Sequence, residues 1–133
     1  MIDFILRENI PTQVVGLMPD RPLDDALKLM NVNKSSYVMV LDGLKPLGVI
    51  TERDMTILLE ESFSGANWED ITVDHVMTSP VITVRDDTTL LEAIELMREV
   101  KIRHAPVVNE LGEITGVLTP QVVIDLLYRG YMQ

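Results

Sequence analysis

Apolar residues recur along this chain at two spacings, and each spacing predicts one kind of secondary structure. Two segments carry apolar residues at positions i, i+3, i+4 and i+7, the spacing of one helical face. Their residues are Leu23, Ala26, Leu27 and Met30 in one segment and Leu90, Ala93, Ile94 and Met97 in the other. Short runs rich in β-branched residues predict strands at 14–17, 37–41, 47–50, 81–84, 105–108 and 114–118. Further helices are expected at 52–61 and 120–128.

The predicted elements form an internal repeat. Ala26 of the first helical stripe returns 67 residues later as Ala93, and Gly48 returns 68 residues later as Gly116. This near-constant offset indicates duplication of a β-α-β-β-α unit. One unit of about 55 residues is too small to cover both faces of its sheet, so we expect two copies packed sheet against sheet about a pseudo-twofold axis. The expected fold class is α+β, in one globular module with a first repeat at 1–65, a linker at 66–73 and a second repeat at 74–133.

A candidate ligand site lies where the strand ending at Ile50 meets the helix that begins after Thr51. A helix N-terminus exposes backbone N–H groups and the positive end of the helix dipole, which suits a phosphate or a hydroxyl-rich ligand. Thr51 offers an oxygen to such a ligand, and Asp54 offers a carboxylate. The same two residues also fit a capping box, in which both side chains serve the helix alone. In that case a passive scaffold is the better interpretation.

Composition and charge narrow the function classes. The net charge is −10 and the sequence pI is about 4.5, which argues against a nucleic-acid partner because a phosphate backbone requires a basic face. The chain contains no cysteine, so thiolate chemistry and disulfides are excluded, and a reducing cytoplasm is the expected location. No apolar run approaches the roughly 18 residues of a membrane span, and no basic signal segment opens the chain. Neither a catalytic triad, a phosphate-binding loop nor a metal-ligand cluster is recognisable, so we expect no enzyme.

Three stretches, taken with the order of the repeats, resemble a tandem pair of CBS domains, also called a Bateman module. These stretches are 73–84, 103–108 and 48–54. The resemblance covers nearly the whole chain, and it implies a regulatory fold that binds an adenine nucleotide (AMP, ADP or ATP) in a cleft between the repeats. No metal and no obligatory cofactor are implied.

The resemblance also implies roles for individual residues. Thr51 and Asp54 would bind the ribose hydroxyls, with Arg53 near the ligand. A carboxylate accepts two hydroxyl donors well, and arginine suits bidentate phosphate contacts. On the phosphate side the resemblance implies Arg103 and His104. On the adenine side it implies the main chain of Val14, Val15 and Gly16.

The second copy departs from this pattern. Val122 stands where the first copy has Asp54, and an apolar side chain cannot hold a ribose diol. Thr119 followed by Pro120 is interpreted as a helix N-cap with proline at the first helical position. We therefore expect one competent nucleotide cleft, with only weak anion affinity in the second. Candidate residues for that second cleft are Thr83, Lys34, Ser35, Ser36 and Thr119.

The leading hypothesis is a ligand-sensing module that transmits a conformational change to a fused or separate effector domain. Two alternatives stay open: a purely structural dimerisation module with no ligand, and a binder of S-adenosylmethionine or an NAD-type adenosyl ligand. Trp68 is expected to pack, and His75 to be structural. A homodimer is expected through helical apolar residues drawn from Met55, Ile57, Leu58, Leu59, Val123, Ile124, Leu126 and Leu127.

Overall fold

The computed structural model describes residues 3–61 and 68–132. The chain divides into two compact units. We call Val15–Val81 the central unit, and Met1–Val14 together with Ile82–Gln133 the terminal unit. Part of the predicted linker, residues 66–67, lies outside the described residues.

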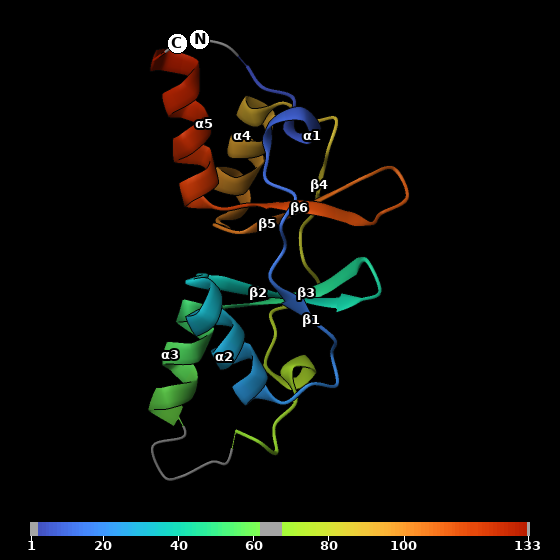
Figure 1. Cartoon of the computed structure of the whole chain (residues 1–133), viewed down its shortest axis with the longest axis vertical. Coiled ribbons are helices and arrows are strands. Elements are labelled where there is room, and N and C mark those ends of the chain that lie inside the picture. The colour runs from blue at the N-terminus through green and yellow to red at the C-terminus, as the bar shows by residue number, and fades with distance from the viewer. Residues whose placement is uncertain (1–2, 62–67, 133) are drawn as a thin grey trace. The chain divides into compact units, whose positions relative to one another are not determined.

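The central unit contains a sheet with the strand order β1-β2-β3 among its described residues. β1 pairs in parallel with β2, and β2 pairs antiparallel with β3. Both of its α-helices lie on one face of this sheet (Figure 1). The elements are β1 (Gly16–Leu17), α2 (Leu23–Asn33), β2 (Tyr37–Asp42), β3 (Lys45–Thr51), α3 (Glu52–Glu61) and the 3-10 helix η1 (Val73–His75).

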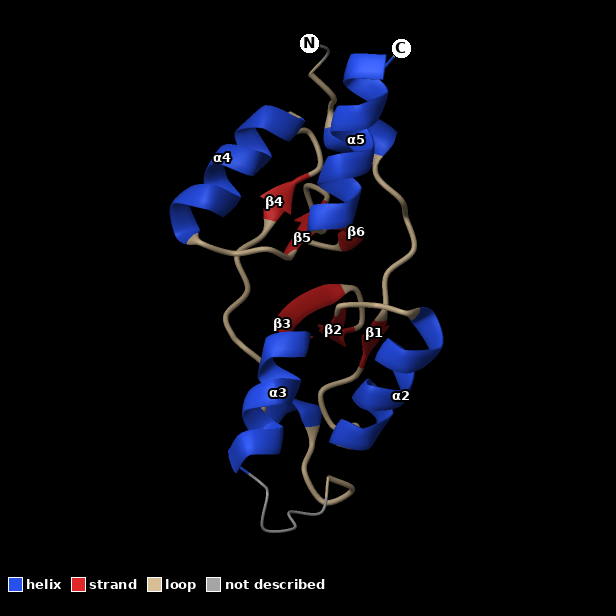
Figure 2. Cartoon of the chain, turned by 90° about the vertical axis from the view of Figure 1, so that its left-hand side faces the viewer, coloured by secondary structure: helices blue, strands red, loops and turns tan. Residues whose placement is uncertain are grey.

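The terminal unit repeats this arrangement with the strand order β4-β5-β6 (Figure 2). Its elements are α1 (Leu6–Asn9), β4 (Val84–Arg85), α4 (Leu90–Val100), β5 (Ala105–Val108), β6 (Ile114–Leu118) and α5 (Pro120–Met132). The β-α-β-β-α order predicted for both copies is therefore confirmed. The predicted bounds of α3, β5 and β6 are those observed. α5 continues four residues beyond the predicted end, because Tyr128 and Met132 extend the helical spacing set by Ile124.

The first strand of each copy is shorter than predicted. β1 contains only Gly16–Leu17 and β4 only Val84–Arg85, although the apolar runs begin at 14 and 81. A strand requires a partner as well as a suitable composition, and only these residues pair with β2 and β5. The residues ahead of them form the connections between the two units.

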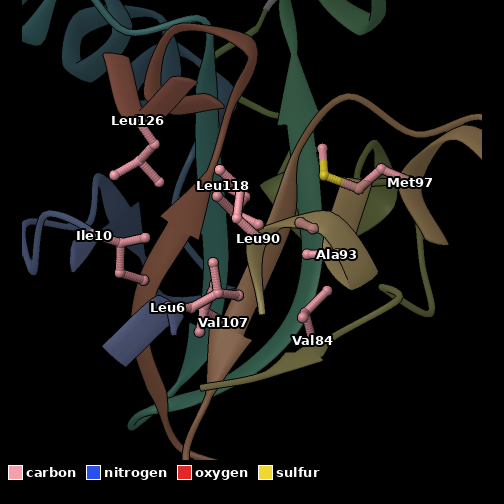
Figure 3. Close-up of a cluster of buried hydrophobic side chains, with 10 residues drawn as sticks. Leu6, Ile10, Val84, Leu90, Ala93, Met97, Val107, Leu118 and Leu126 are labelled. Atoms are coloured by element: carbon pink, nitrogen blue, oxygen red, sulfur yellow. The ribbon is translucent and has the colours of Figure 1, made fainter. Parts of the chain in front are cut away.

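Each unit has its own apolar core. In the terminal unit the side chains of α1, α4 and α5 pack on β5 and β6, and Figure 3 shows Leu6, Leu118 and Leu126 among them. In the central unit the predicted α2 stripe is buried except at Leu27, which is 47% exposed. Leu27 lies on the flank of the stripe, about 60° around the helix from Met30, so it reaches the solvent.

The leading segment of each copy packs in the unit formed by the other copy. In the terminal unit Leu6 N–H donates to Thr88 O (3.0 Å), and Leu90 N–H donates to Phe4 O (2.7 Å). The central unit has the equivalent pair of bonds, from Val73 N–H to Arg21 O at 2.9 Å and from Leu23 N–H to Ile71 O at 2.7 Å. The predicted bounds at 65 and 74 follow the repeats along the sequence, whereas the compact units exchange these segments.

Candidate functional site

The junction between β3 and α3 has the geometry of half a capping box. Asp54 Oδ2 accepts a hydrogen bond from the Thr51 backbone N–H at 2.8 Å. The same oxygen accepts the Thr51 hydroxyl at 3.2 Å. The threonine hydroxyl is thus a donor to the carboxylate, and both side chains are half-buried. The capping box, which the sequence allowed as the alternative to a ligand site, is therefore formed in part.

The Asp54 carboxylate keeps capacity for a ligand. Its second oxygen, Oδ1, accepts no hydrogen bond from the residues that the structure describes. An ionised carboxylate offers about four acceptor positions, so the two bonds from Thr51 leave roughly half of them. The neighbouring Arg53 is exposed and forms no ion pair with another described residue. This junction can accept hydroxyl donors beside a free guanidinium.

The predicted adenine border falls at the start of β1. Val15 C=O accepts Met39 N–H at 2.8 Å, and Val15 N–H donates to the Tyr37 hydroxyl at 3.4 Å. Gly16 pairs with Met39 in the parallel register of β1 and β2. Val14 belongs to the terminal unit, so it is separated from Val15 and Gly16 by the boundary between the units.

Tyr37 was not among the residues predicted for the site. It stands opposite Thr51 in the pairing of β2 with β3 and is 8% exposed. Burial raises the pKa of the Tyr37 phenol above its usual value of 10.0, and the hydrogen bond with the Val15 backbone opposes that rise. The sequence does contain a sign that Tyr37 is special to the first copy: the matching stretch of the second copy, His104 and Ala105, has no hydroxyl.

The second copy lacks the carboxylate and uses its threonine differently. Thr119 Oγ1 accepts Val122 N–H at 3.2 Å, and Thr119 O accepts Val123 N–H at 3.0 Å. The predicted N-cap with Pro120 as the first helical residue is confirmed. Val122 packs against the core of the terminal unit, so it contributes packing where Asp54 contributes an acceptor.

Other candidates for the second cleft serve local structure. Ser35 Oγ donates to Tyr37 O at 2.7 Å and accepts Tyr37 N–H at 3.2 Å. Ser36 O accepts the Glu52 N–H at 3.3 Å. Lys34 ends α2 in the left-handed conformation and is exposed. The hydroxyl of Ser35 is thus already used in both directions by its own strand.

The remaining candidates belong to the terminal unit. Arg103 is exposed and His104 half-buried, immediately ahead of β5. Thr83 is exposed ahead of β4. Because Thr51 and Asp54 belong to the central unit, the joint site with Arg103 and His104 stays a prediction.

A surface hollow in the central unit was not predicted. It encloses about 340 Å³ and is lined by Leu17, Arg21, Asp25, Lys28 and Leu29. Asp25 accepts Arg21 Nε at 2.9 Å, and the second cation of the lining, Lys28, lies 3.8 Å from Asp24, which is not a lining residue. None of the predicted site residues lines it. Over 3–61 and 68–132, no cluster of three or more histidine, cysteine or acidic side chains suits a metal ion.

Two residues expected to be structural have local contacts of that kind. His75 Nδ1 lies 2.7 Å from Thr72 Oγ1 and 3.1 Å from Asp74 Oδ1. The Thr72 hydroxyl, with a smaller contribution from His75, lowers the pKa of Asp74. Trp68 packs against the core of the central unit, as predicted. In the described part of the chain, no helix is both long and apolar enough to cross a membrane.

Comparison with known proteins gives a consistent match over both repeats. The sequence profile of the CBS domain matches residues 8–61 and 73–129. The uncharacterized protein MK0525 of Methanopyrus kandleri is 31% identical over 113 residues, covering 85% of this chain and 57% of that protein. The inosine-5'-monophosphate dehydrogenase of Korarchaeum cryptofilum is 32% identical over 126 residues, covering 95% of this chain and 23% of the enzyme.

A solved structure with a similar fold contains a nucleotide. The crystal structure of CBSX2 in complex with AMP has a TM-score of 0.80 and 27% identity, covering 95% of this chain and 97% of that one. CBSX2 is a CBS-pair protein of Arabidopsis thaliana. The chain spans a little over half of the archaeal MK0525 protein and about a quarter of the dehydrogenase.

Proposed function

The chain belongs to the CBS domain family, and on that premise we propose that it is a regulatory module that binds an adenine nucleotide, AMP, ADP or ATP. The family match covers both repeats. AMP is bound by CBSX2, whose fold is shared along nearly the whole chain. The module would act by binding and not by catalysis, since its candidate side chains are hydrogen-bonding and charged groups suited to hold an anionic, hydroxyl-rich ligand.

The observation that carries this proposal is the half-used carboxylate of Asp54. Its Oδ2 is held by Thr51, and its Oδ1 accepts no bond from the described residues. Thr51 therefore orients the carboxylate at a helix N-terminus, where the dipole stabilises its charge. A cis-diol presents two hydroxyl donors in a fixed geometry, which matches the remaining acceptor positions.

The remaining roles follow the residues predicted from the sequence. Arg53, Arg103 and His104 would neutralise the phosphates, and the backbone at Val14, Val15 and Gly16 would border the adenine. An acidic chain requires such local cations to hold an anionic ligand. The second copy, with Val122 in place of the carboxylate, would not bind a ribose.

A homodimer is the second part of the proposal. Of the apolar residues predicted for a dimer, Met55 and Leu126 are buried in the cores of their own units, so they are not available for a dimer contact. Ile57, Leu59 and Ile124 remain exposed. Exposed apolar side chains on two helices favour self-association. A fused or separate effector domain would receive the conformational change that ligand binding causes. Analytical ultracentrifugation of Ile124→Glu against the natural chain tests this part.

Thermal unfolding with a ligand panel tests the nucleotide proposal. The panel contains AMP, ADP, ATP, S-adenosylmethionine and NAD. Each is added at a concentration far above a Kd in the micromolar range. A ligand at 100 times its Kd stabilises the folded chain by about 2.7 kcal/mol. Asp54→Ala should abolish this stabilisation. Thr89→Ala is the matched control, since it removes the N-cap of α4 and leaves the candidate site intact.

The outcomes separate the alternatives. Stabilisation by the adenine nucleotides that is lost in Asp54→Ala and kept in Thr89→Ala supports the proposal. A response confined to S-adenosylmethionine or NAD would replace the ligand class. If no adenosyl compound changes the melting temperature, the module is a structural dimerisation element.

A further inference from the structure

The hollow in the central unit combines apolar and cationic side chains. It encloses about 340 Å³ beside β1 and α2, which are neighbours in Figure 2. Leu17 of β1 and Leu29 of α2 supply its half-buried apolar surface. Arg21, Asp25 and Lys28 supply its charges. These three residues follow one another at intervals of four and three positions, so they lie along one side of α2 and the turn that leads into it.

The charges of the lining do not cancel. Asp25 Oδ2 accepts both Nε and Nη2 of Arg21, which holds the guanidinium in place while its side chain stays 57% exposed. Lys28 Nζ lies 3.8 Å from Asp24 Oδ2, which is beyond hydrogen-bond distance, and its side chain is 72% exposed. Two cations against one acid leave the lining with a formal charge of +1, on a chain whose net charge is −10.

The second copy shows that the fold does not require these cations. α2 and α4 have the same length and begin 67 residues apart, at Leu23 and Leu90. At that offset the second copy has Thr88 in place of Arg21 and Glu95 in place of Lys28. Ion pairs between residues four positions apart on a helix contribute only about 0.2–0.5 kcal/mol each. Helix stability therefore does not account for two cations beside this hollow.

Size, charge and apolar surface together define the class of ligand. The volume lies at the lower end of the roughly 300–1,000 Å³ that small-molecule sites enclose. A single positive charge suits a monoanion better than a phosphate dianion. Guanidinium and ammonium groups form strong, charge-assisted hydrogen bonds to a carboxylate. The leucine side chains suit an apolar body, which an inorganic ion lacks.

We propose that this hollow is a second ligand site, specific to the first copy, for a small carboxylic acid with an apolar body. Arg21 and Lys28 bind the carboxylate, Asp25 orients Arg21, and Leu17 and Leu29 contact the apolar body. No residue of the candidate nucleotide site lines the hollow. The inference therefore goes beyond the proposed function and does not depend on it.

Titration of the full chain, followed by the NMR shifts of its backbone amides, tests the proposal, with hexanoate as the probe. Hexanoate should give saturable shifts at the amides of Leu17, Asp25 and Leu29. Hexanamide keeps the apolar body without the charge, and inorganic phosphate keeps a charge without the body. Each should bind at least about tenfold more weakly than hexanoate. Sodium chloride at matched ionic strength corrects for screening.

Variants that copy the second repeat test the two cations. Arg21→Thr and Lys28→Glu give each position the residue that the second copy has there, and each should raise the Kd of hexanoate at least about tenfold. Lys45→Glu is the matched control, because it makes the same charge change at an exposed lysine of the central unit that does not line the hollow. The Kd of hexanoate in Lys45→Glu should stay close to that of the natural chain.

Several results would overturn the inference, and the first two need only the natural chain. One is the absence of saturable shifts when hexanoate is titrated well past a millimolar Kd. Another is equal binding of hexanamide or of inorganic phosphate. An equal loss in Lys45→Glu and Lys28→Glu would show that only the overall charge matters. Asp54→Ala should leave the Kd of hexanoate unchanged, and a loss there would place the probe at the nucleotide site. Failure of the chain to bind any nucleotide would end the proposed function and leave this inference standing.

Discussion

Leu6 and Val73 occupy equivalent positions of the two repeats, and each is fully buried in the unit whose sheet comes from the other repeat. The backbone N–H of each donates to a carbonyl ahead of the first long helix of that unit, at Thr88 O and Arg21 O. The duplication therefore includes the exchanged segments as well as the sheets. Each repeat depends on the other for part of its core.

Truncation of Leu6 should destabilise one unit selectively. We expect Leu6→Ala to lower the free energy of unfolding by about 2–5 kcal/mol, because it leaves a cavity in the core of the terminal unit. Amide exchange followed by NMR should then accelerate in β5 and β6 more than in β2 and β3. Val73→Ala is the mirror experiment, with a smaller cost for a smaller side chain and the opposite pattern. Uniform acceleration in both variants would contradict the assignment of these segments to separate units.

Two equivalent glycines allow the exchanged segments to approach the sheets. A Cβ on Gly116 would lie 2.6 Å from Ile10 Cδ1 and 2.8 Å from Pro11 O. A Cβ on Gly48 would lie 2.7 Å from Met77 Cγ. We expect each alanine variant to cost about 1–3 kcal/mol in urea unfolding, with Gly116→Ala the larger because a backbone carbonyl cannot rotate away.

The chain offers its own control for the glycine variants. Met77→Ala should recover part of the loss in Gly48→Ala, since it removes the end of the flexible side chain. Ile10→Ala should recover less in Gly116→Ala, because the Pro11 carbonyl remains. Equal recovery in both pairs would show that side-chain crowding alone sets the cost.

Tyr37 should make stability fall at alkaline pH. Its folded pKa lies above the unfolded value of 10.0 because of burial, so its contribution is complete below about pH 10. As the pH rises from there, the unfolded chain releases the proton first and stability declines. Urea midpoints measured from pH 8 to 11 should decline less steeply in Tyr37→Phe than in the natural chain. Parallel curves would show that the phenol titrates alike in both states.

The ends of α2 and α4 offer two stabilising substitutions. Lys34 and Lys101 adopt left-handed backbone angles, with φ of 50° and 60°. This conformation strains any residue that carries a Cβ, and glycine adopts it freely. Lys34→Gly and Lys101→Gly should each raise stability by about 1 kcal/mol in thermal unfolding. Lys34→Ala is the control: it keeps the Cβ and should give no gain.

Much of the fold was predictable because it depends on short-range pattern. The bounds of α3, β5 and β6 follow from apolar spacing and from helix start signals close by in the sequence. The capping role of Thr119 was likewise predicted from the proline that follows it. The apolar spacing predicted the helix but not how much of its stripe is buried: Leu27 is exposed, because the stripe of four residues is wider than the face that α2 packs.

The candidate site was only half predictable for a related reason. The sequence placed Thr51 beside Asp54, but it could not choose between a capping pair and a ligand site. In the structure one carboxylate oxygen of Asp54 serves the cap, and the other accepts no hydrogen bond from the described residues. The sequence did not predict a role for Tyr37, because its contact with Val15 spans 22 positions. The spacing of apolar residues gives no information on contacts so far apart in the sequence.

By itself the sequence determined that the chain is a duplicated β-α-β-β-α unit with one carboxylate-bearing junction, because repetition and helix signals are local properties of the letters. The tertiary structure alone decided that the leading segments are exchanged and that Val15 is held by a tyrosine. Either sheet could accept either apolar segment on grounds of hydrophobicity. The choice between them is made by the matching of individual hydrogen bonds and side-chain volumes across the chain.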